Sequence, residues 1–336
     1  MAHEESADFL LSSSLDYLYS AALRVAALVN VADQLADGPA DPGELAERTK
    51  THPNALARVL RLLASRGVFH EDGDGRFAIT ARAQALRTDS PTSVRDAVLM
   101  ITEPAIWRPA GELVAGARTG LAAIDAVYGS PFWEVHARDA ATAGEFDAGM
   151  GQWSQLEARG FAQSYRVPPD GLVVDVGGGR GRFLVELLRI RPDLRGILLD
   201  QPIVVSNHDL GQLDDRDRWQ AVSGDFFESV PPDGDVYVLQ YILNDWPDDQ
   251  CVRILQSIRR SMKPESRVVA LECVVPPGNA PHAGKGIDLV LLASFAGRVR
   301  TEAEFAELFS AAGMRLTRVM EKTGPGFLSI VEGVSQ

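Results

Sequence analysis

The chain has 336 residues, enough for two domains, and its 46% hydrophobic and 24% charged residues are typical of a globular protein. Asp and Glu outnumber Lys and Arg by 46 to 33, which gives a formal net charge of −13. A surface this acidic repels nucleic-acid backbones, so we expect no nucleic-acid partner. The N-terminus is acidic where a signal peptide is basic, and no apolar run approaches the roughly 20 residues that span a bilayer. We therefore expect a cytoplasmic protein without membrane contact.

The first predicted segment is a long helical region from residue 9 to residue 35. Its apolar residues recur at close to the helical period of 3.6, at Leu10, Leu15, Leu18, Ala22, Val25 and Val29. An apolar stripe of this length has little to pack on within one small domain. A second copy of the chain would cover it, and we therefore expect a homodimer.

Two short helices and a hairpin are predicted next. Asp41-Pro42 and His52-Pro53 are helix starts, because proline is favoured at the first helical position. Short apolar runs flank the DGDG turn of residues 72–75, which indicates a β-hairpin. This order of elements is the winged-helix arrangement, which often reads DNA. The hairpin tip is acidic, however, so we expect a structural or dimerising role, with a winged-helix ligand-sensing regulator as the alternative.

The rest of the chain changes from helices to alternating strands and helices. Residues 107–165 are mostly helical, with breaks at Gly129 and Pro131. From Gly171 on, apolar strands alternate with helices, which is typical of a parallel sheet covered on both faces. A C-terminal hairpin (314–319 and 327–332) supplies a reversed final strand. We predict an α/β fold, with a Rossmann-like doubly wound sheet after a mainly helical winged-helix N-terminal domain. The predicted domains are 1–105 and 106–336, with a helical substrate lid at 106–165.

The two cysteines, Cys251 and Cys273, cannot form a disulfide framework, and no metal-ligand spacing surrounds them. We expect buried free thiols in a reducing compartment. No carboxylate–histidine ligand set is apparent in the sequence, so no metal site is predicted.

The most informative motif is the stretch DVGGGRG at residues 175–181, between a strand and a helix. Glycine allows a sharp turn and the close approach of a ligand to the backbone. The G-x-G-x-G spacing misplaces the third glycine of a dinucleotide fingerprint, and the chain has no G-x-x-x-x-G-K-[ST] motif. A nicotinamide dehydrogenase and an ATPase-type phosphate site are therefore disfavoured.

Acidic residues follow the next two predicted strands. Asp200 ends the second strand, where a carboxylate would meet a ribose diol. Asp225 and Phe226 follow the third strand, where they would accept from an adenine amino group and stack on its ring. Ligands bind outside the carboxyl ends of strands in open α/β sheets. The sequence therefore predicts a site for an adenosine without phosphates.

Six motifs in combination resemble the plant-type and bacterial secondary-metabolite O-methyltransferases, over nearly the whole chain. They are DVGGGRG (175–181), LDQPIV (199–204), GDFF (224–227), ILNDW (242–246), ALECVVP (270–276) and GRVRT (297–301). The resemblance implies S-adenosylmethionine as cofactor, S-adenosylhomocysteine as product, and a homodimer formed through the winged-helix dimerisation domain. By position, it implies Gly177 and Gly179 for the methionine part, Asp200 for the ribose, and Asp225 with Phe226 for the adenine. The other cofactor-binding residues expected are Asp175, Gln201 and Gln240.

The expected catalytic residues depart from the family pattern. The family's base is a histidine before Asp-Trp, but this chain has Asn244 there, followed by Asp245, and asparagine is no useful base at neutral pH. Glu272 matches the first of two family glutamates, whereas Val299 occupies the position of the second. His136 matches a family position that lines the acceptor pocket, which makes it a candidate replacement base.

Three explanations of this departure stay open. Proximity alone can promote transfer to an acidic phenol or a carboxylate. Alternatively, His136 or Asp245 can replace the missing histidine, or the chain can hold the cofactor for cyclisation, decarboxylation or hydroxylation. The function predicted first is O-methylation of an aromatic or polyketide-type natural product in an apolar, flat pocket. The pocket residues expected are His136, Phe146, Met150, Trp153, Tyr241, Asn244, Val290 and Ser294.

Overall fold

The computed structural model describes residues 2–324 and 326–336, and Pro325 of the C-terminal hairpin lies outside them. The chain packs into two compact units that interleave along the sequence. The first comprises the chain up to Trp107 together with Asp139–Gln152, and the second comprises Arg108–Arg138 together with Trp153–Gln336. The sequence predicts a single boundary between residues 105 and 106, without any segment of one domain lying within the other. Residues 139–152 join the first unit because the Gln152 side chain accepts from the backbone N–H groups of Asp96 and Ala97.

The first unit is helical and contains the winged-helix module. A capping box of Asp41 and Glu44 starts α4, and Pro53 occupies the first turn of α5. The hairpin is antiparallel, with Phe69 opposite Ile79. The elements are α1 (Ala2–Ser13), α2 (Asp16–Leu28), α3 (Val31–Gln34), α4 (Pro42–Thr49), α5 (Pro53–Ser65), β1 (Phe69–Glu71), β2 (Phe77–Ile79), the 3₁₀ helix η1 (Ala83–Leu86) and α6 (Arg95–Ile101).

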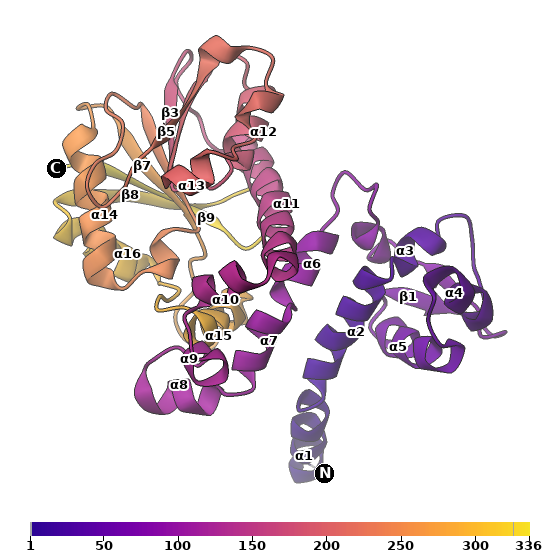
Figure 1. Ribbon diagram of the computed structural model, residues 1–336. Coiled ribbons are helices and arrows are strands. Elements are labelled where there is room, and N and C mark those ends of the chain that lie inside the picture. Colours follow the sequence, from indigo (N-terminus) through magenta and orange to yellow (C-terminus); the bar gives the residue numbers. More distant parts are fainter. Residues whose placement is uncertain (1, 325) are drawn as a thin grey trace. The chain divides into compact units, whose positions relative to one another are not determined.

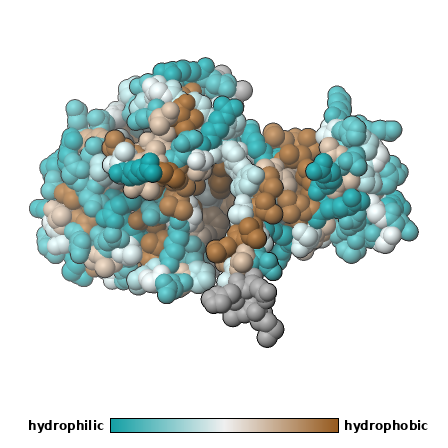
Figure 2. All heavy atoms as spheres, turned by 90° about the horizontal axis from the view of Figure 1, so that it is seen from below, coloured by the Kyte–Doolittle hydropathy of each residue, from teal (hydrophilic) through white to brown (hydrophobic). Residues whose placement is uncertain are grey.

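The long predicted N-terminal helix is divided into α1, α2 and α3. The break before α3 lies at Asn30, whose φ of 53° is left-handed and cannot continue a helix. Ala22 and Ala26 of α2 are buried in the core of the unit, whereas large apolar side chains on the other faces of α1 and α2 stay exposed. Figure 2 shows apolar patches, in brown, on one face of the molecule. The exposed apolar residues of this segment are Phe9, Leu10, Leu11, Leu15, Tyr17 and Leu18.

Four short helices and the 25-residue α11 connect the module to the sheet along the chain, as the mostly helical sequence predicts. Gly129, with a φ of 68°, ends α9 in the left-handed conformation that favours glycine, and Pro131 precedes α10. The helices are α7 (Pro104–Ala110), α8 (Leu113–Thr119), α9 (Ile124–Tyr128), α10 (Phe132–Arg138) and α11 (Ala140–Ser164).

The second unit is built on a seven-stranded sheet in the order β5-β4-β3-β6-β7-β9-β8. Strands β3 to β7 are parallel, and β9 is antiparallel to both of its neighbours, so the predicted reversed final strand is confirmed. The elements are β3 (Leu172–Val176), α12 (Arg182–Ile190), β4 (Arg195–Asp200), α13 (Pro202–Val205), η2 (Leu210–Gln212), η3 (Arg216–Arg218), β5 (Trp219–Ser223), β6 (Val236–Gln240), η4 (Leu243–Asp245), α14 (Asp248–Ser261), β7 (Arg267–Glu272), α15 (Gly284–Ser294), α16 (Glu302–Ala311), β8 (Met314–Glu321) and β9 (Ser329–Ser335).

Helices cover both faces of this sheet (Figure 1). Alternate strand residues enter two separate hydrophobic cores, with Val173 in one and Val174 in the other. Residues of α11 and α12 fill the first core, and residues of α14 and α16 fill the second. Cys273 lies in the first core and Cys251 in the second, and both thiols are free and buried, as predicted.

The described part of the chain shows neither a membrane-spanning helix nor a metal-binding cluster. None of the helices described here combines the length and the apolarity needed to cross a membrane. Within residues 2–324 and 326–336, no group of three or more His, Cys, Asp or Glu side chains is placed to hold a metal ion.

Candidate functional site

The strand order reverses between β3 and β6, and polar residues gather at the carboxyl ends of the strands there. Gly177 follows β3, Asp200 ends β4, Gln240 ends β6, and Asp225 lies two residues beyond β5. Such a reversal is where open α/β sheets bind ligands. The sheet therefore brings the predicted cofactor-binding residues to one edge.

The loop between β3 and α12 needs its glycines. Gly177 and Gly179 have φ values of 71° and 59°, which other residues rarely adopt. A β-carbon at Gly177 would also lie 2.7 Å from Ile242 Cδ1 and 3.3 Å from Phe226 Cε1. At Gly179, by contrast, it would meet no atom within 4 Å, so a ligand can approach the backbone there.

Asp200 is tied to this loop by its own carboxylate. Its two oxygens accept from the backbone N–H groups of Gly179 at 2.8 Å and Gln201 at 2.7 Å. Burial raises the pKa of Asp200, and these two bonds oppose that rise. The carboxylate is thereby held in one orientation and keeps lone pairs for a hydroxyl donor.

Asp175 lies beneath the loop without any partner. It is fully buried, neither of its oxygens has a hydrogen bond, and burial raises its pKa to about 7, with Asp200 adding to the rise. A buried carboxyl left unpaired is costly. The group is therefore suited to a cation or a hydrogen-bond donor supplied by a ligand.

Asp225, Phe226 and Gln240 complete the predicted cofactor set. Asp225 is exposed and accepts from the backbone N–H of Phe227 at 2.8 Å, while Phe226 packs beside Gly177. The amide nitrogen of Gln240 is buried without an acceptor. An exposed acid, an aromatic ring and an unpaired amide thus surround the glycine loop.

Three of the predicted catalytic residues, Asn244, Asp245 and Glu272, lie together at or beyond the ends of β6 and β7. The Oε1 of Glu272 accepts from the backbone N–H of Leu243 at 2.7 Å, which holds η4 and therefore Asn244 against the end of β7. The Oε2 of Glu272 and the Oδ1 of Asn244 are buried without partners. Burial raises the pKa of Glu272 to about 8 and that of Asp245 to about 7, so Glu272 is mostly protonated at neutral pH.

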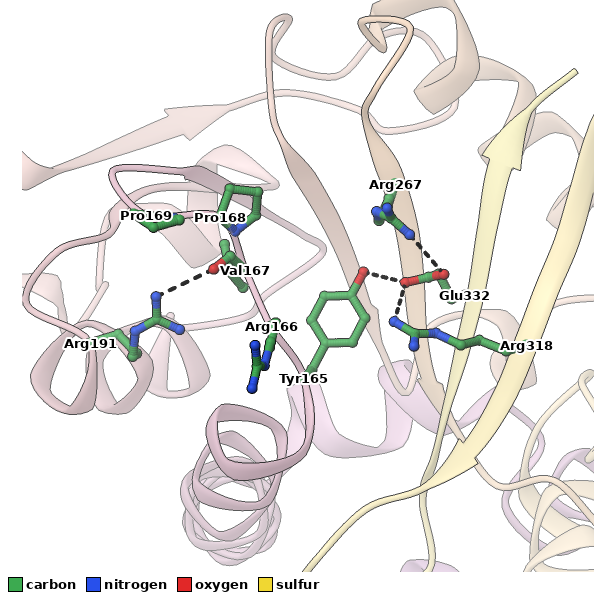
Figure 3. Close-up of a pocket in the computed structure, with 9 residues that line it drawn as sticks. All are labelled: Tyr165, Arg166, Val167, Pro168, Pro169, Arg191, Arg267, Arg318 and Glu332. Atoms are coloured by element: carbon green, nitrogen blue, oxygen red, sulfur yellow. Dashed lines mark hydrogen bonds and ion pairs between the residues drawn. The ribbon is translucent and has the colours of Figure 1, made fainter.

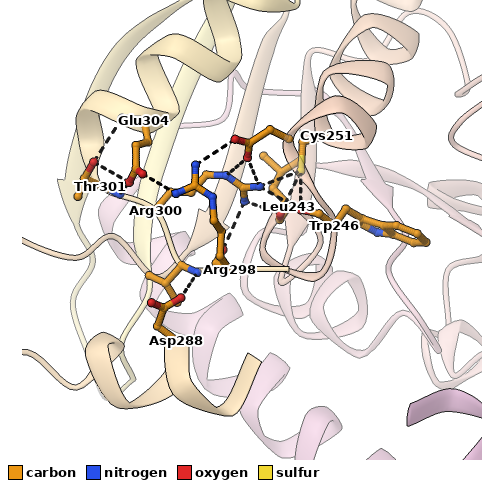
Figure 4. A network of polar contacts seen from close by, with 10 residues as sticks. Leu243, Trp246, Cys251, Asp288, Arg298, Arg300, Thr301 and Glu304 are labelled. Carbon is orange, nitrogen blue, oxygen red and sulfur yellow. Dashed lines mark hydrogen bonds and ion pairs between the residues drawn. The ribbon is translucent and has the colours of Figure 1, made fainter. Parts of the chain in front are cut away.

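Arg300, which we did not predict as a site residue, holds the loop of residues 243–246 through its backbone oxygens (Figure 4). Its side chain is 1% exposed. It donates to the backbone oxygens of Leu243 at 2.6 Å and Trp246 at 3.0 Å, and it pairs with Asp248 at 2.7 Å. Gly297 is equally necessary, because its β-carbon would lie 1.8 Å from the backbone oxygen of Asn244. The motif GRVRT contains both residues, but its sequence pattern does not reveal what they contact.

His136 is buried in α10 among aromatic rings. Its ring lies 4.0 Å from that of Phe132, which in turn lies 4.3 Å from that of Phe295. Its Nδ1 is 3.0 Å from the backbone oxygen of Phe132. Because a carbonyl can only accept, Nδ1 carries the hydrogen in this contact.

Comparison with known proteins identifies the family of this chain over nearly its whole length. A family model described as the O-methyltransferase domain matches residues 107–315, and one described as the O-methyltransferase dimerisation domain matches residues 11–89. This chain belongs to the O-methyltransferase family. The methyltransferase fold and the dimerisation module predicted from the sequence are thereby confirmed, and neither the non-methyl enzyme nor the winged-helix regulator is favoured.

Individual relatives cover the chain almost completely. A phenazine O-methyltransferase of Lysobacter antibioticus is 37% identical over 96% of this chain and 94% of its own length. The mitomycin biosynthesis 6-O-methyltransferase of Streptomyces lavendulae is 36% identical over 93% of this chain and 89% of its own. The crystal structure of CalO1, a methyltransferase in calicheamicin biosynthesis in its SAH-bound form, is 42% identical, covers 100% of both chains and has a TM-score of 0.91.

The predicted acceptor-pocket residues of this O-methyltransferase lie in both units. Tyr241 directly follows β6 and packs on Trp153, with ring centroids 5.5 Å apart, and the Ser294 hydroxyl is buried without a partner. Val290 lies in α15. Phe146 and Met150 belong to the first unit, so their part in the pocket stays a prediction.

A separate hollow of about 690 Å³ lies at the opposite end of β7 from Glu272 (Figure 3). It contains none of the predicted site residues. There Glu332 accepts from Tyr165 at 2.6 Å, and it pairs with Arg267 at 3.1 Å and Arg318 at 3.0 Å. This cluster ties β9 to β8 and to the chain that follows α11, away from the candidate active site.

Proposed function

We propose that this O-methyltransferase takes a methyl group from S-adenosylmethionine and transfers it to a hydroxyl of an aromatic or polyketide-type natural product. The names of the phenazine and mitomycin relatives support the substrate class, and the SAH-bound relative supports the cofactor. The observation that carries the proposal is the line of polar groups at the switch point. Asp175, with both carboxyl oxygens unpaired, and Asn244, with its Oδ1 unpaired, lie on the two sides of this switch point.

The residues present fit the cofactor. The unpaired carboxyl of Asp175 would receive the ammonium group of the methionine part, Gly179 leaves room for that part, and Gly177 allows the turn of the loop. Asp200 and Gln201 would hold the ribose, and the adenine would lie against Asp225 and Phe226, with Gln240 nearby. When bound, the cofactor supplies a methyl group on a positively charged sulfur.

The acceptor oxygen would be oriented by Asn244. The reaction forms the O–CH₃ bond while the S–CH₃ bond breaks, its electron pair stays on sulfur, and the acceptor loses its hydroxyl proton. Glu272 is a poor base because its pKa of about 8 keeps it mostly protonated at neutral pH. Alignment of an acidic hydroxyl with the methyl group is therefore the main source of rate, and His136 is the residue that we propose to take the proton.

The homodimer is part of the same proposal. The exposed apolar side chains of α1 and α2, such as Phe9, Leu10 and Leu11, are suited to burial by a second copy. Light scattering at micromolar concentration would give twice the chain mass of 36.4 kDa, and a monomer would contradict it.

One experiment tests the function. The protein is titrated calorimetrically with S-adenosylmethionine and then incubated with it and a panel of hydroxylated naphthalenes and phenazines, with mass spectrometry to detect methylated products. Asp200→Ala should weaken cofactor binding by at least about tenfold, because two backbone contacts and the ribose site are lost together. Failure of the parent to bind the cofactor, or to methylate any acceptor, would overturn the proposal.

Two variants separate the sources of rate. His136→Ala should lower kcat with little change in KM if His136 takes the proton, and equal rates would remove it from the mechanism. Asn244→His should raise the rate on simple phenols if the missing base limits turnover. No gain there would favour alignment alone.

A further inference from the structure

A buried ion pair lies behind the acceptor side of the site. Glu157 of α11 and Lys322, which follows β8, are 3.0 Å apart, and their side chains are 0% and 1% exposed. The end of the β8–β9 hairpin closes tightly over the pair. A β-carbon at Gly326 would lie 2.3 Å from the Oε1 of Glu157, and one at Gly160 would lie 2.3 Å from the backbone oxygen of Thr323.

The carboxylate of Glu157 is poorly satisfied for so buried a position. Neither oxygen of Glu157 has a well-formed hydrogen bond, and burial raises the pKa of Glu157 to about 7 against the opposing effects of Lys322 and Tyr241. Burial of an ion pair costs more than burial of apolar side chains of the same volume, unless further hydrogen bonds compensate. Stability alone therefore gives no reason for the pair.

Tyr241 connects the pair to the active site. It is the first residue after β6 and adopts a φ of 56°, which is rare for a residue other than glycine and is found most often at functional sites. Its hydroxyl is buried without a hydrogen bond, and burial raises its pKa well above the ordinary value, with the charges of Glu157 and Glu272 adding to the rise. Its ring is only partly buried and packs on Trp153, which in turn packs on Phe327 at 5.9 Å.

Three distant parts of the chain thus converge on one aromatic ring. Trp153 and Glu157 are four residues apart on α11 and share one helix face, and Lys322 and Phe327 come from the hairpin. Tyr241 comes from the strand end beside the glycine loop. Trp153 contacts the Tyr241 ring, so Glu157, one helical turn further along α11, lies next to Tyr241.

We propose that Glu157 and Lys322 are positioning residues for methyl transfer, which hold the Tyr241 hydroxyl and so fix the Tyr241 ring as a wall of the acceptor pocket. The inference rests on the proposed function. A displaced wall would let an aromatic acceptor tilt away from the methyl group, and small misplacements of a reacting group cost large factors in rate.

The test compares Tyr241→Phe with the double variant Glu157→Met/Lys322→Met in the full chain. The double variant removes both charges together, so no lone charge is left buried. Each variant should lower kcat by about tenfold, and Tyr241→Phe added to the double variant should cause no further loss. Affinity for S-adenosylmethionine should stay within about twofold, because the ring lies on the acceptor side.

Glu332→Gln is the matched control. It removes the charge of another buried glutamate of the same unit, at the opposite end of β7, and should leave kcat unchanged. The substrates are S-adenosylmethionine and the naphthalene or phenazine that gave product with the parent.

The outcomes separate the two proposals. A parent that methylates no acceptor overturns the proposed function and this inference with it. A parent that is active, with wild-type kcat in Tyr241→Phe or in the double variant, overturns only the positioning role. Fully additive losses also overturn it, because they would show that the ion pair and the hydroxyl act separately. If the double variant does not fold, Tyr241→Phe alone decides.

Discussion

Two buried glutamates of the second unit differ in how well they are satisfied. Glu332, 1% exposed, accepts from Tyr165, Thr317, Arg267 and Arg318, and these partners hold its pKa below the usual range although burial raises it. Glu157, 0% exposed, has one cation and no well-formed hydrogen bond, and burial raises its pKa to about 7. Similar burial therefore gives opposite shifts in pKa, and the number of partners makes the difference.

The comparison separates structural polar groups from those that serve the reaction. Arg300 resembles Glu332, since it donates to Leu243, Trp246 and Asp248 around a loop that must stay fixed. Asp175 resembles Glu157, since both are fully buried and neither has a well-formed hydrogen bond to its carboxyl oxygens. Arg300 and Glu332, which have several partners, hold the fold, whereas Asp175 and Asn244 have unpaired buried oxygens where we propose that the cofactor and the acceptor bind.

The largest effect is expected from Arg300→Leu. The substitution removes the guanidinium donor from the backbone oxygens of Leu243 and Trp246 and leaves them to the weak thiol donor of Cys251, so the free energy of unfolding should fall by about 3 kcal/mol, measured by urea denaturation. The control is Arg298→Leu, whose half-exposed side chain pairs with Asp248 and Glu304 and should cost less than about 1 kcal/mol. Equal losses of unfolding free energy in the two variants would show that the buried Arg300 contributes no more to stability than the half-exposed Arg298.

Glu332→Gln should have the next largest effect, on stability and not on catalysis. The loss of charge weakens its bonds to Tyr165, Arg267 and Arg318, and about 2 kcal/mol of unfolding free energy should be lost. Because the pKa of Glu332 is lowered in the fold, its charge contributes to the free energy of unfolding at pH values above the ordinary glutamate pKa. That contribution is lost as the pH falls below this value. The variant should therefore lose less stability than the parent below about pH 4.5. A large loss of kcat would contradict the structural assignment.

The smallest effect is expected from Asp175→Asn, in cofactor affinity. A cationic ligand favours the ionised carboxylate, so affinity of the parent for S-adenosylmethionine should rise as the pH passes through about 7. The variant should bind about tenfold more weakly at pH 8, with little dependence on pH. Because the pKa of Asp175 is raised in the fold, the protonated carboxyl favours the folded state at low pH, and this stability is lost as the pH rises through about 7. Without ligand, the variant should therefore be at least as stable as the parent at pH 8. The same rise of affinity with pH in both proteins would exclude Asp175 as its cause.

Much of the cofactor edge could be predicted, because its signals are local. Glycine spacing, an acid at a strand end and the order of strands place Gly177, Asp200 and Asp225 without knowledge of any long-range contact. The departures at Asn244 and Val299 could also be seen in the sequence. The role of Arg300 could not, since nothing nearby indicates that it would reach back more than fifty residues to Leu243.

By itself, the sequence determined the two kinds of domain, the parallel sheet with its reversed last strand, and the residues at the switch point. Only the tertiary structure decided that residues 139–152 pack with the first unit, and that Glu157, Tyr241 and Lys322 meet. The physical reason is the range of the forces that select each feature. Turn geometry and strand periodicity act within a few residues, whereas a buried charge acquires its partners only when distant segments pack together.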